Sequence, residues 1–103
     1  MFERAMERER LWAGEMVAVT VGGRRVLLVD VDGEVAAYPD RCCHQGVPLS
    51  QGKLKGGVIT CSAHGWEYDA RTGQGRNPRG VRLACLAVEI RDGEIWVDVQ
   101  PPG

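Results

Sequence analysis

Three glycine-containing dipeptides divide this chain into short runs of residues that favour β-strands. The dipeptides are Gly22-Gly23, Asp32-Gly33 and Asp92-Gly93. Glycine readily adopts the positive φ angles that a two-residue hairpin turn requires, and aspartate tolerates them. The flanking runs are rich in Val, Ile, Leu and Trp, and Glu94–Val99 alternates so that Ile95, Val97 and Val99 share one face. The sequence therefore predicts an all-β chain of about eight short strands in stacked antiparallel sheets.

The rest of the chain adds further strands and one long loop. Strand patterns occur at Gly56–Cys61 and Trp66–Ala70, with a turn at Ser62–Gly65, and an apolar strand is predicted at Leu83–Ile90. One helical turn is possible within Ala5–Trp12, although no longer window shows a helical apolar period. The residues between Pro39 and Lys55 show no strand pattern and are predicted to form a loop. Long loops in compact domains are usually functional.

Length and charge narrow the class of protein. The 103 residues fit one domain, residues 1–103, and the net charge of −1 gives no reason to expect nucleic acid or an anionic membrane as a partner. No apolar run is long enough to span a bilayer, and the charged N-terminus does not resemble a secretory signal. We therefore expect a cytoplasmic protein whose four cysteines bind metal or remain free thiols rather than form a disulfide framework.

Nearly all side chains that can bind a metal lie in two short clusters. The clusters are Cys42-Cys43-His44 and Cys61-Ser62-Ala63-His64. They hold both histidines and three of the four cysteines in a C-x-H, C-x-x-H pattern with sixteen residues between. Two loops of this kind that face each other supply two sulfur and two nitrogen ligands. This donor set suits tetrahedral zinc or a [2Fe–2S] cluster of the Rieske kind.

The mixture of ligands within each cluster discriminates between these two metals. Structural zinc sites usually pair two cysteines in one loop with two cysteines or two histidines in the other. In a Rieske centre one iron is bound by two cysteines and the other by two histidines, so a loop that reaches both irons needs one of each. The pattern favours the [2Fe–2S] cluster, and a zinc-stabilised binding module without a redox role is the alternative.

The residues around both clusters resemble those of Rieske proteins. The stretch GGVITCSAHGWEYDARTGQG, followed by Asn77-Pro78, is similar to the soluble Rieske ferredoxins of bacterial multicomponent oxygenases. The stretch LWAGEM at Leu11–Met16 places the likeness in the branch that serves toluene monooxygenases. The resemblance covers essentially the whole chain. It implies a Rieske fold, with stacked antiparallel sheets, two cluster-binding loops and one [2Fe–2S] cluster.

The same resemblance implies a role for each ligand. Cys42 and Cys61 would bind the inner iron, and His44 and His64 would bind the outer iron near the surface. Tyr68 occupies the place of a tyrosine that donates a hydrogen bond to a ligand thiolate in high-potential relatives.

This chain departs from the high-potential relatives at three positions. Val47 and Ala63 stand where those relatives carry an inter-loop disulfide, and Trp66 replaces a serine that donates to a bridging sulfide. Fewer donors to the sulfurs stabilise the reduced state less. We therefore expect a reduction potential in the lower part of the Rieske range, which spans about −150 to +300 mV.

A surface beside the ligands is expected to dock redox partners transiently. It would comprise Gln45, Gly46, Val47, Pro48, Ala63, Gly65, Trp66 and Pro78. The resemblance implies a monomeric electron carrier, not an enzyme. It would take single electrons from an NADH-dependent flavin reductase to a terminal oxygenase, with a diiron monooxygenase of aromatic compounds or alkenes as the expected acceptor. The ferredoxin of a ring-hydroxylating dioxygenase is the nearest alternative, and the small subunit of an assimilatory nitrite reductase is a further one.

Several side chains have simpler interpretations. Cys85 lies in an apolar run and is predicted to be a buried core thiol, and Trp12 and Trp96 are predicted to be core residues. Cys43 is predicted to be a spare thiol, because only Cys42 has the C-x-H spacing to His44.

Overall fold

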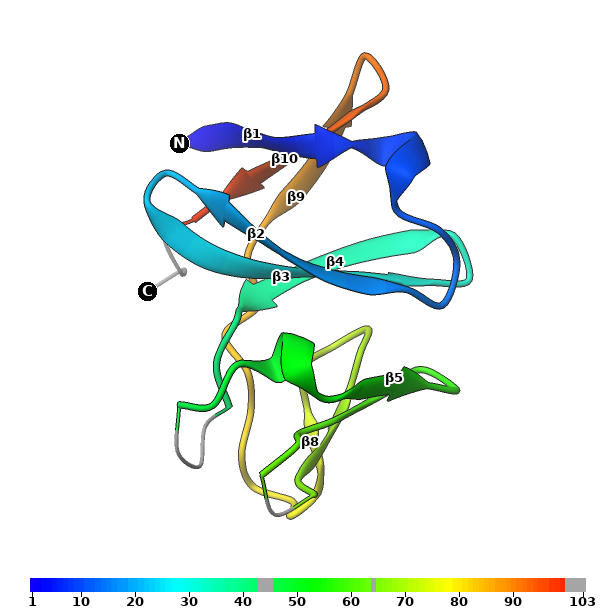
Figure 1. Cartoon of the computed structure of the whole chain (residues 1–103), viewed down its shortest axis with the longest axis vertical. Coiled ribbons are helices and arrows are strands. Elements are labelled where there is room, and N and C mark those ends of the chain that lie inside the picture. Colours follow the sequence, from blue (N-terminus) through cyan, green and yellow to red (C-terminus); the bar gives the residue numbers. More distant parts are fainter. Residues whose placement is uncertain (43–45, 64, 100–103) are drawn as a thin grey trace.

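Three antiparallel sheets form the framework of the computed structural model, which describes residues 1–42, 46–63 and 65–99 (Figure 1). The first sheet has the order β1 (Phe2–Glu7), β10 (Glu94–Asp98), β9 (Val88–Arg91). The second has the order β2 (Met16–Val21), β3 (Arg24–Val31), β4 (Glu34–Pro39). The third has the order β5 (Lys53–Lys55), β6 (Val58–Thr60), β7 (Glu67–Asp69), β8 (Gly75–Asn77). The all-β prediction is confirmed.

The predicted hairpin turns are present, and a fourth of the same kind accompanies them. Both residues of each predicted dipeptide have positive φ, for example 53° at Asp32 and 87° at Gly33. The fourth turn, between β5 and β6, is formed by Gly56 and Gly57 with φ angles of 57° and 77°. The sequence predicts a turn role for both glycines, which is confirmed, but the strand predicted at Gly56–Cys61 begins only at Val58.

The second sheet is the middle layer, because β3 is buried on both faces. Figure 1 shows β2–β4 between the first sheet above and the third sheet below. Val26 and Leu28 of β3 pack into a core with the first sheet, whereas Leu27 and Val29 pack into a core with the third sheet. Side chains of a strand point alternately to opposite faces, so a run that is apolar at every position suits a middle layer. Ile95, Val97 and Val99, which the sequence pattern places on one face, are all buried.

The single helical turn predicted within Ala5–Trp12 is present as the 3-10 turn η1 (Arg8–Arg10). The residues before it pair with β10 as strand β1. Trp12 is 70% exposed, so its assignment to the core was wrong. The predicted loop before β6 contains a second 3-10 turn, η2 (Leu49–Gln51), and strand β5.

The segment that precedes β9 also departs from the prediction. Leu83 is buried in the core below the middle sheet and Leu86 in the core above it, so this segment crosses from one core to the other. Its backbone bonds to Gly73 and Ala37 rather than to a continuous strand. Cys85 lies between the two leucines and is exposed, so its prediction as a buried thiol was wrong. Trp96 is partly buried.

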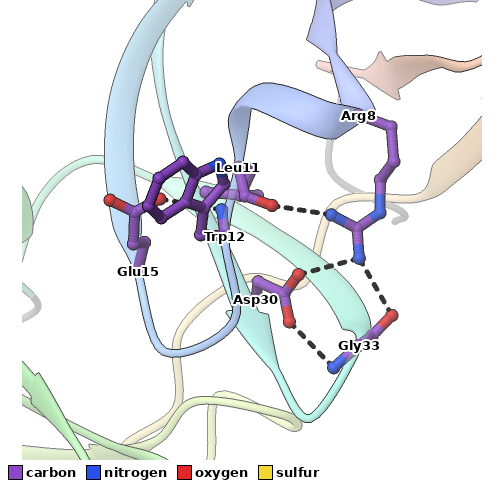
Figure 2. A network of polar contacts seen from close by, with 6 residues as sticks. All are labelled: Arg8, Leu11, Trp12, Glu15, Asp30 and Gly33. Carbon is purple, nitrogen blue, oxygen red and sulfur yellow. Dashed lines mark hydrogen bonds and ion pairs between the residues drawn. The ribbon is translucent and has the colours of Figure 1, made fainter.

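An ion pair between the partly exposed Arg8 and the buried Asp30 fixes the start of the chain to the middle sheet (Figure 2). The guanidinium of Arg8 donates to Asp30 Oδ2 at 2.7 Å and to the backbone oxygens of Leu11 and Gly33. The other carboxylate oxygen of Asp30 accepts the backbone N–H of Gly33 at 2.9 Å. Asp30 is 1% exposed, and these bonds satisfy the carboxylate that burial removes from water. In the described part of the chain, no helix has the length and apolar character needed to cross a membrane.

Candidate metal centre

The first cysteine of the predicted site begins a short loop that closes on itself. Cys42 follows β4, and its backbone N–H donates to the oxygen of Val47 at 2.8 Å. The N–H of Gly46 donates back to the oxygen of Cys42 at 2.9 Å. Gly46 has φ of 70°, a conformation that other residues adopt only with strain. These two hydrogen bonds close the loop between Cys42 and Val47, with Cys42 at its base.

The second cysteine begins a loop with the same closure. Cys61 follows β6, and its N–H donates to the oxygen of Trp66 at 2.8 Å. In both loops the N–H of the cysteine bonds to the oxygen five residues later, and a glycine with positive φ stands four residues after the cysteine. Gly65 has φ of 66°. The two loops thus present their cysteines by one common backbone arrangement, with the predicted ligands His44 and His64 outside the described residues.

The two cysteine side chains meet in the lower core beside a tyrosine hydroxyl. Cys42 is 2% exposed, Cys61 is 1% exposed and Tyr68 is fully buried. The hydroxyl of Tyr68 lies 3.3 Å from the Sγ atom of Cys42. Burial raises the pKa of the Cys61 thiol, a hydrogen bond from the backbone at Ala63 opposes this rise, and the adjacent Cys42 thiol adds to it. Neither Cys42 nor Cys61 is part of a disulfide, so the structure brings two potential sulfur ligands together as separate thiols.

A third loop lies next to the second one. Glu67, just after the Cys61 loop, pairs with Asn77 at the end of β8. The residues after β8 pack directly against Gly75. A Cβ atom at this position would lie 2.6 Å from both the oxygen of Pro78 and Cγ2 of Val81, so only glycine fits there. The Asn77–Pro78 peptide bond is cis. The pairing of Glu67 with Asn77 places this third loop, which follows β8 and contains Pro78, beside the loop that begins at Cys61. Figure 1 shows the segment after β8 at the lower end of the molecule.

A buried aspartate that the sequence interpretation missed anchors the first loop. Asp40 is 7% exposed, and its two carboxylate oxygens accept the backbone N–H and the hydroxyl of Ser50, each at 2.8 Å. Arg25 approaches the same carboxylate at 3.9 Å. These bonds tie the residue two before Cys42 to η2 and so fix the start of the loop. The only signal in the sequence was the position of Asp40 between a strand and the ligand cluster.

The residues predicted to dock partners fall into three groups. Gly65 is exposed, whereas Gly46, Val47, Pro48, Ala63, Trp66 and Pro78 are partly buried, and Gln45 lies outside the described residues. Val47, Ala63 and Trp66 pack against the lower core, so they support the loops from inside while part of each reaches the surface. Cys43, the predicted spare thiol, also lies outside the described residues.

The described residues fit the sulfur half of a [2Fe–2S] site. Buried thiols that stand side by side in an apolar core are soft ligands screened from water. Within the described residues, no three side chains of histidine, cysteine, aspartate or glutamate are grouped as a metal site, and half of the predicted ligand set is outside them. Tyr68 adds a hydroxyl donor beside one sulfur, a contact of the kind that tunes metal centres.

Comparison with known proteins identifies the family. The sequence model of the Rieske [2Fe-2S] domain matches residues 2–87. The ferredoxin component of the alkene monooxygenase system of Xanthobacter autotrophicus is 39% identical over 92 residues, covering 88% of this chain and 75% of the relative. The biphenyl dioxygenase ferredoxin subunit of a Pseudomonas species is 35% identical over 99 residues, covering 94% of this chain and 91% of the relative.

Solved structures agree with the expected Rieske fold. A chain in the complex of reduced oxygenase and oxidized ferredoxin of carbazole 1,9a-dioxygenase superposes with a TM-score of 0.88 at 28% identity, covering 98% of this chain and 95% of that one. The chain also matches one part of some longer proteins. In the 4beta-methylsterol monooxygenase of Methylococcus capsulatus the match covers 26% of the length of that protein, at 35% identity. The family match spans most of the chain, and the two ferredoxin components are covered over 75% and 91% of their length. This protein therefore belongs to the Rieske [2Fe-2S] domain family, as an electron-carrying ferredoxin of the multicomponent oxygenase type with one Rieske-type cluster.

Proposed function

We propose that this ferredoxin carries single electrons from an NADH-dependent flavin reductase to the terminal oxygenase of a diiron monooxygenase that acts on alkenes or aromatic compounds. The 39% identity to the alkene monooxygenase ferredoxin supports the monooxygenase assignment. The observation that carries the electron-transfer role is the pair of buried, unlinked thiols of Cys42 and Cys61, presented by two loops with the same closure. The cytoplasm, where NADH is available to the reductase, remains the expected location.

The four predicted ligands are part of this proposal. Cys42 and Cys61 would hold the inner iron, and His44 and His64 the outer iron. When bound, the cluster accepts and releases one electron at a time. The protein's own contribution is to fix the two cysteines at the base of closed loops, to exclude water from their sulfurs with the lower core, and to direct the Tyr68 hydroxyl toward Cys42.

The partners would bind at the end that carries the loops. An electron carrier must release each partner quickly, and weak transient contacts with small interfaces suit that task. Gly65 and the partly buried Trp66 and Pro78 offer small and apolar surface there, together with Gly46, Val47, Pro48 and Ala63. Gln45 completes the proposed docking set. We propose that the chain works as a monomer, which leaves this end open to each partner in turn.

A second function has specific support. One relative is the ferredoxin subunit of a biphenyl dioxygenase, and one similar solved structure is the complex of oxygenase and ferredoxin of carbazole 1,9a-dioxygenase. Both belong to dioxygenase systems. By this alternative the acceptor is a ring-hydroxylating dioxygenase that carries a Rieske centre of its own.

Reconstitution separates these possibilities. The purified holoprotein is mixed with NADH, a flavin reductase and either a diiron monooxygenase or a ring-hydroxylating dioxygenase, and product formation is measured with and without the ferredoxin. Turnover that depends on the ferredoxin with the diiron enzyme alone supports the proposal, and turnover with the dioxygenase alone supports the alternative. A colourless protein that contains zinc and no iron would overturn both.

A further inference from the structure

Charge is distributed very unevenly between the two ends of this molecule. The part that carries the ligand loops, residues 41–86, contains seven Lys and Arg residues and two Asp and Glu residues. The remaining part, residues 1–40 and 87–103, contains six Lys and Arg residues and twelve Asp and Glu residues. The formal charges are therefore +5 for the cluster part and −6 for the basal part, although the net charge is only −1.

Four exposed cations of the cluster part surround the ligand loops. Arg41 precedes Cys42, and its guanidinium lies 3.0 Å from the place that a Cβ atom at Gly46 would occupy. Lys53 pairs with Thr60, the residue before Cys61. Arg76 and Arg79 flank the cis Asn77–Pro78 bond in the third loop. Each of the three loops at this end thus contains an exposed cation or follows a residue that pairs with one.

Within the part of the chain that the structure describes, these four cations lack an ion-pair partner, in contrast to most arginines of the basal part. Among the described residues, no carboxylate forms an ion pair with Arg41, Lys53, Arg76 or Arg79. Five of the six basal arginines do pair with carboxylates. They are Arg4 with Glu94, Arg8 with Asp30, Arg10 with Glu7, Arg25 with Asp40, and Arg91 with Glu89. An exposed cation without a nearby carboxylate attracts an anionic surface. In an ion pair, the carboxylate cancels most of the electrostatic field that the cation produces at a distance.

We propose that the cations around the ligand loops, Arg41, Lys53, Arg76 and Arg79, dock the ferredoxin onto an acidic surface of the terminal oxygenase. This inference rests on the proposed function, and it names the chemistry of the partner surface that the function requires. The oxygenase is chosen over the reductase because the related carbazole 1,9a-dioxygenase structure is a complex of ferredoxin and oxygenase. The acidic basal part is repelled by the same surface, so the charge asymmetry turns the loop end toward the oxygenase before contact.

The local charge at the loop end can be measured with two small one-electron acceptors. Reduced holoprotein is mixed by stopped flow with ferricyanide or with hexaammineruthenium(III), and each acceptor takes one electron to give ferrocyanide or hexaammineruthenium(II). The rate constant with the anionic acceptor should fall as salt rises from low ionic strength, and that with the cationic acceptor should rise. The reverse result, a rate constant that rises with salt for ferricyanide and falls for hexaammineruthenium(III), would overturn the proposal. The same trend for both acceptors would overturn it as well.

A pair of charge-reversal variants locates the effect. Arg79→Glu should slow oxidation by ferricyanide about tenfold at low salt, a difference that disappears at high salt. Arg24→Glu is the matched control, because Arg24 is an exposed basal arginine, at the start of β3, and the variant has the same net charge. Equal slowing in both variants would show that net charge, rather than charge beside the loops, controls the rate.

The partner is tested by binding and by electron delivery. With a terminal oxygenase whose turnover the wild-type protein supports, Arg79→Glu should weaken binding measured by calorimetry about tenfold at low salt, and Arg24→Glu should not weaken it. If Arg79→Glu slows reduction by the reductase but leaves oxygenase binding unchanged, the oxygenase assignment is overturned. If the wild type supports no oxygenase, the proposed function fails and the choice of partner fails with it, whereas the small-acceptor rates still report the charge at the loop end.

Discussion

The hydroxyl of Tyr68 and the Sγ atom of Cys42 lie 3.3 Å apart in the lower core, and both side chains are buried. Tyr68 comes from β7 and Cys42 follows β4, so the contact joins two sheets. A hydroxyl in this position can donate to a thiolate, and a donor to a ligand sulfur stabilises the more negative, reduced state of a metal centre. This relationship provides the first of four predictions.

Tyr68→Phe should retain the cluster and lower its reduction potential by about 20–60 mV, which corresponds to the loss of one hydrogen bond of about 0.5–1.5 kcal/mol. Potentiometric titration of the visible spectrum measures the change. Tyr38→Phe is the matched control, because Tyr38 is equally buried but its hydroxyl donates to the oxygen of Ala70 rather than to sulfur. Equal potentials for Tyr68→Phe and wild type would show that the hydroxyl does not act on Cys42.

Cys61→Ala should remove the cluster, because no other described thiol lies next to Cys42 in the core. Iron content per chain and the visible absorption spectrum measure the loss. Cys85→Ser is the control: Cys85 is exposed, so this variant should keep about two irons per chain and an unchanged spectrum. Cys43→Ser should behave like Cys85→Ser. Iron retained in Cys61→Ala, or lost in Cys43→Ser, would contradict the ligand assignment.

Arg8→Ala should lower the free energy of unfolding by about 3–5 kcal/mol, because it leaves the buried carboxylate of Asp30 without its cation. Urea denaturation measures the change. Arg10→Ala removes an exposed arginine whose ion pair with Glu7 is 3.6 Å long, and it should change the free energy by less than about 0.5 kcal/mol. A loss of similar size in both variants would mean that the buried pair is no more important than a surface pair.

Tyr38 should make stability fall at alkaline pH. Burial raises the pKa of Tyr38 above its usual range, and the nearby Cys85 and Asp69 add to the rise while Arg82 opposes it. The unfolded chain ionises this phenol near pH ~10, whereas the folded chain keeps it neutral to higher pH. The contribution of the neutral Tyr38 phenol to folding stability is therefore fully present below the pKa of the unfolded chain. It is lost as pH rises toward the higher pKa of the folded chain.

The variant Tyr38→Phe isolates this effect. Its free energy of unfolding should decline less steeply between about pH 9 and 11 than that of the wild type, although it starts lower because the hydrogen bond to Ala70 is absent. Urea denaturation at a series of pH values gives the two slopes. Parallel slopes would exclude Tyr38 as the group responsible.

Local patterns predicted much of this protein correctly. The turn dipeptides, the alternation of β10 and the all-β class follow from backbone preferences and side-chain periodicity, which act within a few residues. The family followed from the spacing of cysteine and histidine together with the residues around them. Of the ligand set, the structure describes Cys42 and Cys61 and brings them together, whereas His44 and His64 remain predictions.

Errors arose where burial depends on distant segments. Cys85 and Trp12 are in runs that contain apolar residues, yet both are exposed, because their neighbours Leu83, Leu86 and Leu11 take the buried positions. The residues from Pro39 to Lys55 contain more regular structure than predicted, because β5 gains its hydrogen bonds from β6. Apolar character alone does not determine which side of an extended segment faces a core.

The sequence by itself determined the chain reversals, the ligand types and their spacing, since these depend on the local chemistry of each residue. Only the tertiary structure decided that β3 is buried on both faces, that Asp40 anchors the first loop through Ser50, and that Tyr68 reaches Cys42. Each of these depends on segments separated in the chain but packed together by the sheets. The same holds for the cations beside the loops. The sequence determines their charge, whereas folding places them around one end, where they form no ion pair with any described carboxylate.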